Sequence, residues 1–227
     1  MKLTYFGHSA FRVVTEQIAI VFDPWLLSNP HGSVPLAEAP CDYILCSHAH
    51  DDHIADAVAL ARLHGATIVA PFELADYFAT HGVATLDLMP GGGVTLPWGR
   101  IDMTPAIHSS SLELPNAPAR AMGVPSGYRV QTAGRTLYHA GDTALFGDMR
   151  LIARTPLDLA LLPIGDFYTM GPDDAVAALD LLRPRLAVPM HYNSNEKIRV
   201  DPHAFATAAA SAGHTVRVMT PGETTAL

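Results

Sequence analysis

The chain has 227 residues, of which 49% are hydrophobic and 16% are charged, a composition typical of a globular domain. Its formal net charge of −8 argues against broad electrostatic binding to phosphate backbones, so a nucleic acid is not an expected partner. No stretch reaches the roughly 18 uncharged apolar residues that a membrane-spanning helix needs, so we expect no membrane partner either.

The first quarter of the chain has the pattern of an antiparallel sheet. Residues 2–6, 10–14 and 18–22 are rich in β-branched and aromatic residues, and the polar residues 15–17 suit a hairpin turn. Residues 42–46 (DYILC) predict a short buried strand that leads into a histidine-rich turn.

Strands and helices alternate through the rest of the chain. The patterns predict helices at residues 54–64, 73–81, 148–154, 172–182 and 202–212. They predict strands at residues 67–70, 85–89, 100–107, 128–132, 136–140, 158–164 and 186–190. The glycine run at residues 91–93 lacks the lysine and the helix start of a phosphate-binding loop, so we expect a tight turn there.

Both halves of the chain contain sheet-rich segments in which helices follow strands, and this order predicts an α/β fold. We expect an αββα sandwich, in which two mixed β-sheets pack face to face and helices cover both outer faces. No linker-like composition interrupts the chain, so residues 1–227 are expected to form a single domain.

The turn CSHAHDDH at residues 46–53 is rich in groups that bind metals. His48 and His50 are two residues apart, so both side chains point to the same side of an extended backbone. Asp52 and His53 follow where the chain bends toward the next helix. Imidazole suits zinc, and carboxylate also suits manganese or iron. The turn therefore predicts ligands for two neighbouring divalent ions; the alternative is an acidic, solvated turn.

Three further candidate ligands follow predicted strands. His108 comes after residues 100–107, Asp142 closely follows residues 136–140, and His191 directly follows residues 186–190. Active-site loops in layered α/β folds occupy such places. We expect these three side chains to face the same edge as the histidine-rich turn.

On these motifs the chain resembles the metallo-β-lactamase superfamily over nearly its whole length. HAHDDH is similar to the hallmark loop of that superfamily, and TPAIHSSS, YHAGDT and VPMHYN are similar to its later ligand segments. The segments GHSAF, FDPWL, HAGDTALFGDM and LPIGDFYTMGP resemble a bacterial family of metal-dependent hydrolases related to the L-ascorbate-6-phosphate lactonases. The resemblance implies a hydrolytic site with two metal ions.

The resemblance also implies how the ligands are divided. The first ion would take His48, His50 and His108, the second would take Asp52, His53 and His191, and Asp142 would bridge the two. Zinc is the first expectation for both ions, with manganese, iron and nickel as alternatives.

A two-metal site implies a mechanism. Two metals that share a water lower its pKa from about 15.7 toward roughly 7, and the resulting hydroxide would attack a carbonyl carbon or a phosphorus. Asp52 is expected either to orient this nucleophile and move its proton or to serve only as a ligand. His8 in GHSAF is expected either to protonate the leaving group or to bond a backbone group beneath the site.

Several other residues have two interpretations. Asp23 is expected either to orient a metal-binding histidine or to cap the turn before a proline. His139, inside a predicted strand, is expected to be buried and hydrogen-bonded. Ser109 to Ser111 are interpreted as loop hydroxyls near the substrate, and Asp166 and Tyr192–Asn193 as further substrate contacts.

The expected function is hydrolysis of an ester, lactone or phosphodiester bond in a small anionic metabolite. The alternatives are an RNA or nucleotide phosphodiesterase and a metal-binding protein without turnover. The first residues, MKLTYFGHSAF, lack the apolar core of a signal peptide, and Cys41 and Cys46 are expected to be reduced thiols. We therefore expect a cytoplasmic protein, and homo-oligomerisation is left open.

Overall fold

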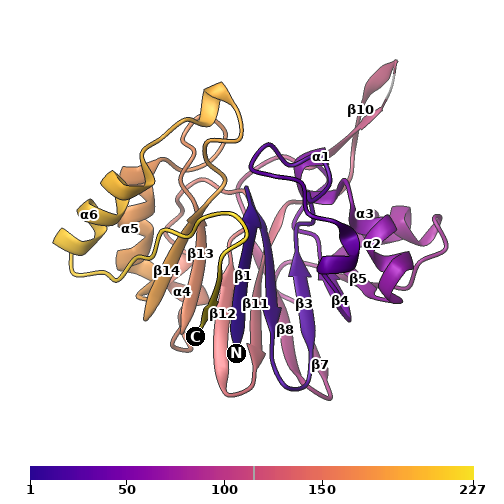
Figure 1. Ribbon diagram of the computed structural model, residues 1–227, viewed down its shortest axis with the longest axis horizontal. Coiled ribbons are helices and arrows are strands. Elements are labelled where there is room, and N and C mark those ends of the chain that lie inside the picture. The colour runs from indigo at the N-terminus through magenta and orange to yellow at the C-terminus, as the bar shows by residue number, and fades with distance from the viewer. Residues whose placement is uncertain (115) are drawn as a thin grey trace.

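Two large β-sheets pack face to face in the protein (Figure 1). The computed structural model describes residues 1–114 and 116–227. The first sheet has the strand order β15-β1-β2-β3-β4-β5-β6 and the second has the order β14-β13-β12-β11-β8-β7. The strands of the first sheet are β1 (Lys2–Gly7), β2 (Ala10–Val14), β3 (Ala19–Phe22), β4 (Tyr43–Leu45), β5 (Thr67–Pro71), β6 (Thr85–Leu88) and β15 (Thr224–Ala226). Those of the second are β7 (Gly93–Leu96), β8 (Gly99–Pro105), β11 (Ser126–Thr132), β12 (Arg135–His139), β13 (Leu159–Pro163) and β14 (Leu186–Met190).

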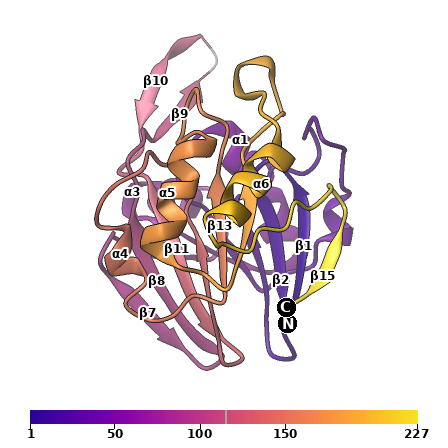
Figure 2. The same ribbon diagram turned by 90° about the vertical axis from the view of Figure 1, so that its left-hand side faces the viewer.

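Helices cover the outer face of each sheet. Figure 1 shows α2 and α3 on one outer side and α5 and α6 on the other, and Figure 2 shows α5 and α6 lying over the second sheet. The helices are α1 (Asp51–Ile54), α2 (Ala57–His64), α3 (Phe72–Ala79), α4 (Met149–Ile152), α5 (Pro172–Leu182) and α6 (Pro202–Ser211), with short 3-10 turns η1 (Leu36–Glu38) and η2 (Glu196–Ile198). The arrangement confirms the predicted αββα sandwich. Within residues 1–114 and 116–227, no helix is long and apolar enough to cross a membrane.

The core follows from alternation along the strands. Ile20 and Phe22 of β3 point into the layer between the sheets, whereas Val21 packs in the layer under α2 and α3. Tyr128 of β11 joins the two sheets, because its hydroxyl donates hydrogen bonds to the carbonyl oxygens of Cys46, at 2.8 Å, and Val69, at 3.1 Å. These bonds hold the second sheet against the start of the histidine-rich turn.

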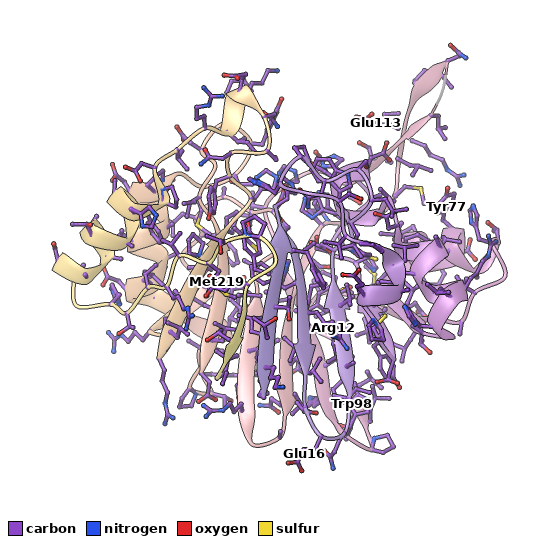
Figure 3. All side chains as sticks on the ribbon, in the orientation of Figure 1. Arg12, Glu16, Tyr77, Trp98, Glu113 and Met219 are labelled. Carbon is purple, nitrogen blue, oxygen red and sulfur yellow. The ribbon has the colours of Figure 1, made fainter. Side chains whose placement is uncertain are left out.

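The strand directions bring the functional loops to one end of the sandwich. Strands β3, β4 and β5 run parallel to one another, and so do β12, β13 and β14. Because the carboxyl ends of parallel strands lie at the same edge of a sheet, the loops that follow them gather there. Figure 3 shows Glu113 at this end and Glu16 at the opposite end; Glu113 belongs to β9 (Ser111–Leu114), which forms a projecting hairpin with β10 (Ala117–Ala121).

Some predicted elements differ from the structure. The predicted helix at residues 54–64 is wrong at its start, because α1 and α2 are separated at Asp56. The Asp56 carboxylate accepts hydrogen bonds from the backbone nitrogens of Leu26, at 2.6 Å, and Leu27, at 2.9 Å, so this residue anchors a neighbouring loop. The sequence patterns also missed β7, β9, β10 and β15, whose side chains are mostly exposed and therefore show little apolar alternation.

Candidate metal centre

Eight histidine and aspartate side chains meet at the end of the sandwich where the strands of both sheets finish. They are His8, His48, His50, Asp52, His53, His108, Asp142 and His191, and they include all seven residues predicted to bind metals. Asp52 and His53 belong to α1, and the other six lie in loops that follow β1, β4, β8, β12 and β14. These loops span most of the chain, so only the folded sandwich brings the eight side chains together.

Asp142 lies at the centre of the cluster. Its Oδ2 is 2.9 Å from Nε2 of His191 and 3.6 Å from Nε2 of His108. Its Oδ1 is 3.4 Å from Nε2 of His53, and its Oδ2 is 4.0 Å from Nε2 of His48. A single carboxylate thus contacts histidines from both of the predicted ligand sets.

The candidate ligand atoms fall into three groups, each with all atoms within 4.8 Å of one another. One group is the set predicted for the first ion, and it comprises His48, His50 and His108. Another contains the set predicted for the second ion together with His8, and it comprises His8, Asp52, His53 and His191. The third joins His48, His53 and Asp142. The grouping agrees with the predicted division of ligands, and the ligand roles themselves stay predictions.

Asp23, at the end of β3, orients two of these histidines. Its Oδ2 lies 2.7 Å from Nδ1 of His53 and accepts a 2.7 Å hydrogen bond from the Ser47 hydroxyl, which lies 2.9 Å from Nδ1 of His48. An ionised carboxylate only accepts hydrogen bonds, so Nδ1 of His53 carries the proton that it shares with Asp23. The Ser47 hydroxyl hydrogen points to Asp23, so the Ser47 oxygen accepts a hydrogen bond from Nδ1 of His48. In the neutral imidazole form, which is the form that binds metals, a proton on Nδ1 leaves Nε2 free, and both Nε2 atoms face Asp142. These contacts agree with the orienting role expected of Asp23, and the metal-binding role of the two histidines stays a prediction.

Ser47 was missed by the sequence interpretation, although it directly precedes His48 in the turn. Its backbone nitrogen also donates a 2.7 Å hydrogen bond to Oδ1 of Asp23, so the turn is fixed at two points. Such outer partners set the direction and the tautomer of metal-binding histidines.

His8 lies next to Asp52, His53 and His191 in the cluster and is fully buried. Its Nδ1 is 2.9 Å from the Ser194 hydroxyl, and its Nε2 is 3.3 Å from Oδ2 of Asp52. Among the described residues its ring bonds no backbone group, so that interpretation of His8 is wrong. His8 does not line the cavity, whereas Asp52, which its Nε2 faces, does.

The electrostatics of the cluster suit a cation. Burial lowers the pKa values of His48, His50 and His108, which favours neutral imidazoles. Burial raises the pKa of Asp142, but the neighbouring His191 and His53 lower it more, so this pKa lies well below its ordinary value. Neutral imidazole and ionised carboxylate are the forms that bind metals.

Unsatisfied polar atoms point to the same conclusion. Nε2 of His53 and Oδ1 of Asp142 are buried and have no hydrogen-bond partner among the described residues. Buried polar atoms in folded proteins nearly always have partners, and a divalent cation between these atoms would supply one. The donor set therefore fits the metal ions that the sequence predicted.

A cavity of about 870 Å³ opens above the cluster. Asp52, Asp142 and His191 line it, as do Trp25, Ser109, Glu113, Tyr168 and Asn195. Of the three serines predicted near the substrate, only Ser109 lines the cavity, and the Ser110 hydroxyl instead donates to the carbonyl oxygen of Met122 at 3.0 Å.

The other predicted substrate contacts need correction. Asp166 and Tyr192–Asn193 do not line the cavity, whereas Tyr168 and Asn195, two residues further along in each loop, do. A strand pattern cannot decide which residue of a following loop turns inward. His139 is buried as expected, with its Nε2 3.0 Å from the Ser9 carbonyl oxygen.

Comparison with known proteins gives a consistent result. A family model described as "Beta-lactamase superfamily domain" matches residues 19–192. The "UPF0173 metal-dependent hydrolase" of Opitutus terrae is 67% identical over 224 residues, covering 99% of each chain. A UPF0173 metal-dependent hydrolase from Thermus thermophilus is 44% identical over 223 residues, covering 98% of this chain and 97% of the relative.

Solved structures extend the comparison. Igni18, described as a novel metallo hydrolase from the archaeon Ignicoccus hospitalis, is 40% identical with a TM-score of 0.90, covering 99% of this chain and 97% of its own. An isothiocyanate hydrolase from Delia radicum gut bacteria has a TM-score of 0.78 at 19% identity, covering 100% of this chain and 99% of its own, and it shares the fold. The two-sheet architecture, the histidine and aspartate cluster and these relatives together show that the chain belongs to the metallo-β-lactamase superfamily, in its family of UPF0173 metal-dependent hydrolases.

Proposed function

We propose that this metal-dependent hydrolase binds two divalent metal ions and cleaves an ester, lactone or phosphodiester bond in a small anionic metabolite. The observation that carries the proposal is the position of Asp142, whose two carboxylate oxygens face histidines of both ligand groups. Zinc is the first candidate because most of the proposed ligands are imidazoles, and manganese, iron and nickel are the alternatives.

The proposed ligands keep the division given above, with His48, His50 and His108 at one ion, Asp52, His53 and His191 at the other, and Asp142 between them. When bound, two such ions supply Lewis acidity and lower the pKa of a water at the site. Asp23 holds the ring of His53 directly and that of His48 through Ser47, so two ligands reach the site already oriented.

Proton transfer is assigned to Asp52 and His8. The Asp52 side chain is 36% exposed and lines the cavity, so it can contact both a water and a bound substrate. His8 Nε2 lies 3.3 Å behind it, on the side away from the cavity. We therefore place Asp52 at the reacting atoms, with His8 holding or exchanging the proton of that carboxylate.

The cavity wall favours a small substrate over a polynucleotide. Asp51 and Glu113 line it in addition to the proposed ligand carboxylates, and no arginine or lysine stands among the lining residues in the described part of the chain. A polynucleotide would require cationic side chains along its path.

The proposal is tested by turnover and metal content measured on the same samples. Protein reconstituted separately with zinc and with manganese is offered lactones, esters, phosphodiesters and short RNA. We expect two ions per chain and turnover of a small anionic substrate. Two bound ions with no turnover of any class would favour a metal-binding protein, and preference for RNA would favour the phosphodiesterase.

The division into two ligand groups is tested by His108→Ala and His191→Ala. We expect the first variant to lose mainly one ion and the second to lose mainly the other, because each histidine belongs to a different group. Mass spectrometry of the native protein counts the ions that remain. Loss of both ions to the same degree in each variant would contradict two separate groups.

A further inference from the structure

Two aromatic rings and an ammonium group meet beside the cavity, which one of the rings lines. Phe167 and Tyr168 follow β13 and are 62% and 46% exposed. Their ring centroids are 4.8 Å apart with an interplanar angle of 75°. Lys197, in η2, places Nζ 3.1 Å from the Tyr168 hydroxyl, 5.1 Å from the Phe167 ring centroid and 5.6 Å from that of Tyr168. We call these three residues the rim cluster.

The rim cluster reaches the wall of the metal site through Tyr168. Tyr168 lines the cavity together with Asp52 and His191, and so does Asn195, which lies two residues before Lys197. In Figure 1 the loop that contains η2 projects on one side of this end of the molecule, and the hairpin of β9 and β10 projects on the other. A molecule bound at the metal centre would therefore extend between these two projections.

The loop that carries the aromatic rings is tied to two ligand loops. The backbone nitrogen of Met170 donates a 2.9 Å hydrogen bond to the carbonyl oxygen of Thr143, the residue after Asp142. Gly165 packs so closely on His191 that a Cβ at this position would overlap the His191 carbonyl oxygen. The position of the rings relative to Asp142 and His191 is thus set by backbone contacts.

Exposure of these rings requires an explanation. Single exposed apolar side chains are common, but two adjacent aromatic rings beside a polar cavity form a contiguous surface. Aromatic rings bind planar groups by stacking or edge contacts, and Lys197 adds a positive charge at their edge. Lys197 is one of two lysines in the chain, and the other, Lys2, lies in β1.

Charge is distributed unequally across the cavity. Asp51 and Glu113 line the cavity, whereas Lys197 lies outside its lining and donates a hydrogen bond to the hydroxyl of Tyr168, a lining residue. An anionic substituent would be repelled by Asp51 and Glu113 and attracted toward Lys197.

We propose that the rim cluster is a substrate-binding subsite, and that the substrate has a planar ring bearing a carboxylate or another anionic group. The ring would lie against Phe167 and Tyr168, the anionic group would face Lys197, and the bond to be cleaved would reach the Asp142 cluster. This inference rests on the proposed function and narrows its substrate class.

Binding of three phosphonates tests the subsite without requiring turnover. Zinc-loaded protein is titrated by calorimetry with methylphosphonate, phenylphosphonate and 4-phosphonobenzoate, and zinc is counted on the same sample. We expect the phenyl ring to tighten binding by about 3- to 10-fold over the methyl group. We expect the added carboxylate to tighten it by a further factor of about 2 to 5.

Variants assign these two gains to named side chains. Phe167→Leu and Tyr168→Leu should reduce the advantage of phenyl over methyl, and Lys197→Gln should remove the advantage of the carboxylate alone. The matched controls are Phe72→Leu, an exposed aromatic residue of α3 that does not line the cavity, and Lys2→Gln. Both controls should keep the wild-type ratios.

The outcomes separate the subsite from the hydrolase. A zinc-loaded protein that binds the three probes equally, or binds none, overturns the subsite, as do rim variants with unchanged ratios. If the zinc-loaded protein shows the expected affinity ratios but hydrolyses no substrate, the subsite proposal stands and the proposed hydrolase function is wrong. A protein that takes up no zinc overturns the metal centre, and the subsite falls with it.

Discussion

Asp23 and Asp142 are both buried carboxylates, but they have different partners. Asp23 is satisfied by the protein itself, since its oxygens receive hydrogen bonds from Ser47 and His53. Asp142 faces imidazole nitrogens, and its Oδ1 has no hydrogen-bond partner among the described residues. A buried oxygen without a partner is unfavourable unless a cation supplies the missing interaction. The two carboxylates therefore correspond to an orienting residue and a proposed ligand.

Replacing Asp142 tests the ligand role. Asp142→Asn keeps the size of the side chain but removes a negative charge, so we expect the protein to fold and to bind less than its full metal complement. Loss of an outer partner alone typically costs roughly 10–100-fold in metal affinity or activity, and loss of a bridging ligand should cost at least about that much. The control is Asp148→Asn, whose carboxylate is 71% exposed. Metal counts that are equal in the two variants would disprove the bridge.

Replacing Asp23 tests the orienting role. Asn at this position tolerates the observed φ of 42°, but its NH₂ group cannot accept the protons that Oδ2 now receives. His53 should then change its tautomer or turn, and we expect metal affinity to fall by about 10–100-fold. Chelator competition measures that affinity. Asp56→Asn serves as the control, because Asp56 bonds backbone nitrogens of Leu26 and Leu27; it should lower stability and leave metal affinity unchanged.

At the scale of secondary-structure elements, the site is built from left-handed turns at strand ends. His8, Asp23 and His191 directly follow β1, β3 and β14 and have φ values of 54°, 42° and 54°. This conformation costs a non-glycine residue roughly 1–2 kcal/mol. Backbone strain of this kind is often found at functional sites, where the surrounding structure maintains it. In this protein it turns each side chain toward the cluster as soon as its strand ends.

Gly141 allows a matched test of such a turn, since it directly precedes Asp142. Its φ is 61°, and an added Cβ would overlap the carbonyl oxygen of Ser126. Gly134 has a similar φ of 71° but open space around the Cβ position. We expect Gly134→Ala to lower the free energy of unfolding by roughly 1–2 kcal/mol, the cost of backbone strain alone.

Gly141→Ala should lower the free energy of unfolding by about 1–3 kcal/mol more than Gly134→Ala does, because the new methyl group must displace neighbouring backbone. It should also weaken metal binding by moving Asp142, whereas Gly134→Ala should not. Urea unfolding of the metal-free proteins measures the first effect and chelator competition the second. Equal unfolding free energies for the two variants would show that the turn has room to adjust.

At the scale of the whole molecule, two apolar layers support the site from below. One lies between the sheets and continues under α4, α5 and α6, and the other lies between the first sheet and helices α2 and α3. Cys41 and Cys46 belong to the second layer and are free thiols, as the sequence analysis expected. Burial raises the pKa of the Cys41 thiol to about 12 and also raises that of Cys46 well above its ordinary value.

These thiols should report on global unfolding. At pH 8 both pKa values lie far above the pH, so the reactive thiolate is scarce, and both side chains are buried. We expect a disulfide reagent to modify the native protein slowly and the urea-unfolded protein at the rate of an ordinary cysteine. The absorbance of the thiolate released from the reagent measures the rate of the reaction. Fast modification of one thiol in the native protein would show that its layer opens locally.

The sequence by itself determined the elements and the chemistry of this protein. Periodicity located α5 at Pro172–Leu182 as predicted, and apolar runs located β4, β12, β13 and β14 to within two residues. These strands are recognisable because burial on both faces requires continuous apolar residues. The proposed ligands and their order were also visible, since a turn such as residues 46–53 has no packing reason to contain three histidines.

Only the tertiary structure decided which of these side chains meet. The contact of His8 with Ser194 joins residues 186 positions apart, and Asp23 reaches His53 across 30 positions. Strand order, strand direction and the turn at each strand end determine these distances, and local sequence patterns carry none of that information. For the same reason the sequence suggested Asp166 as a substrate contact, whereas the folded loop presents Tyr168 to the cavity and turns it toward Lys197.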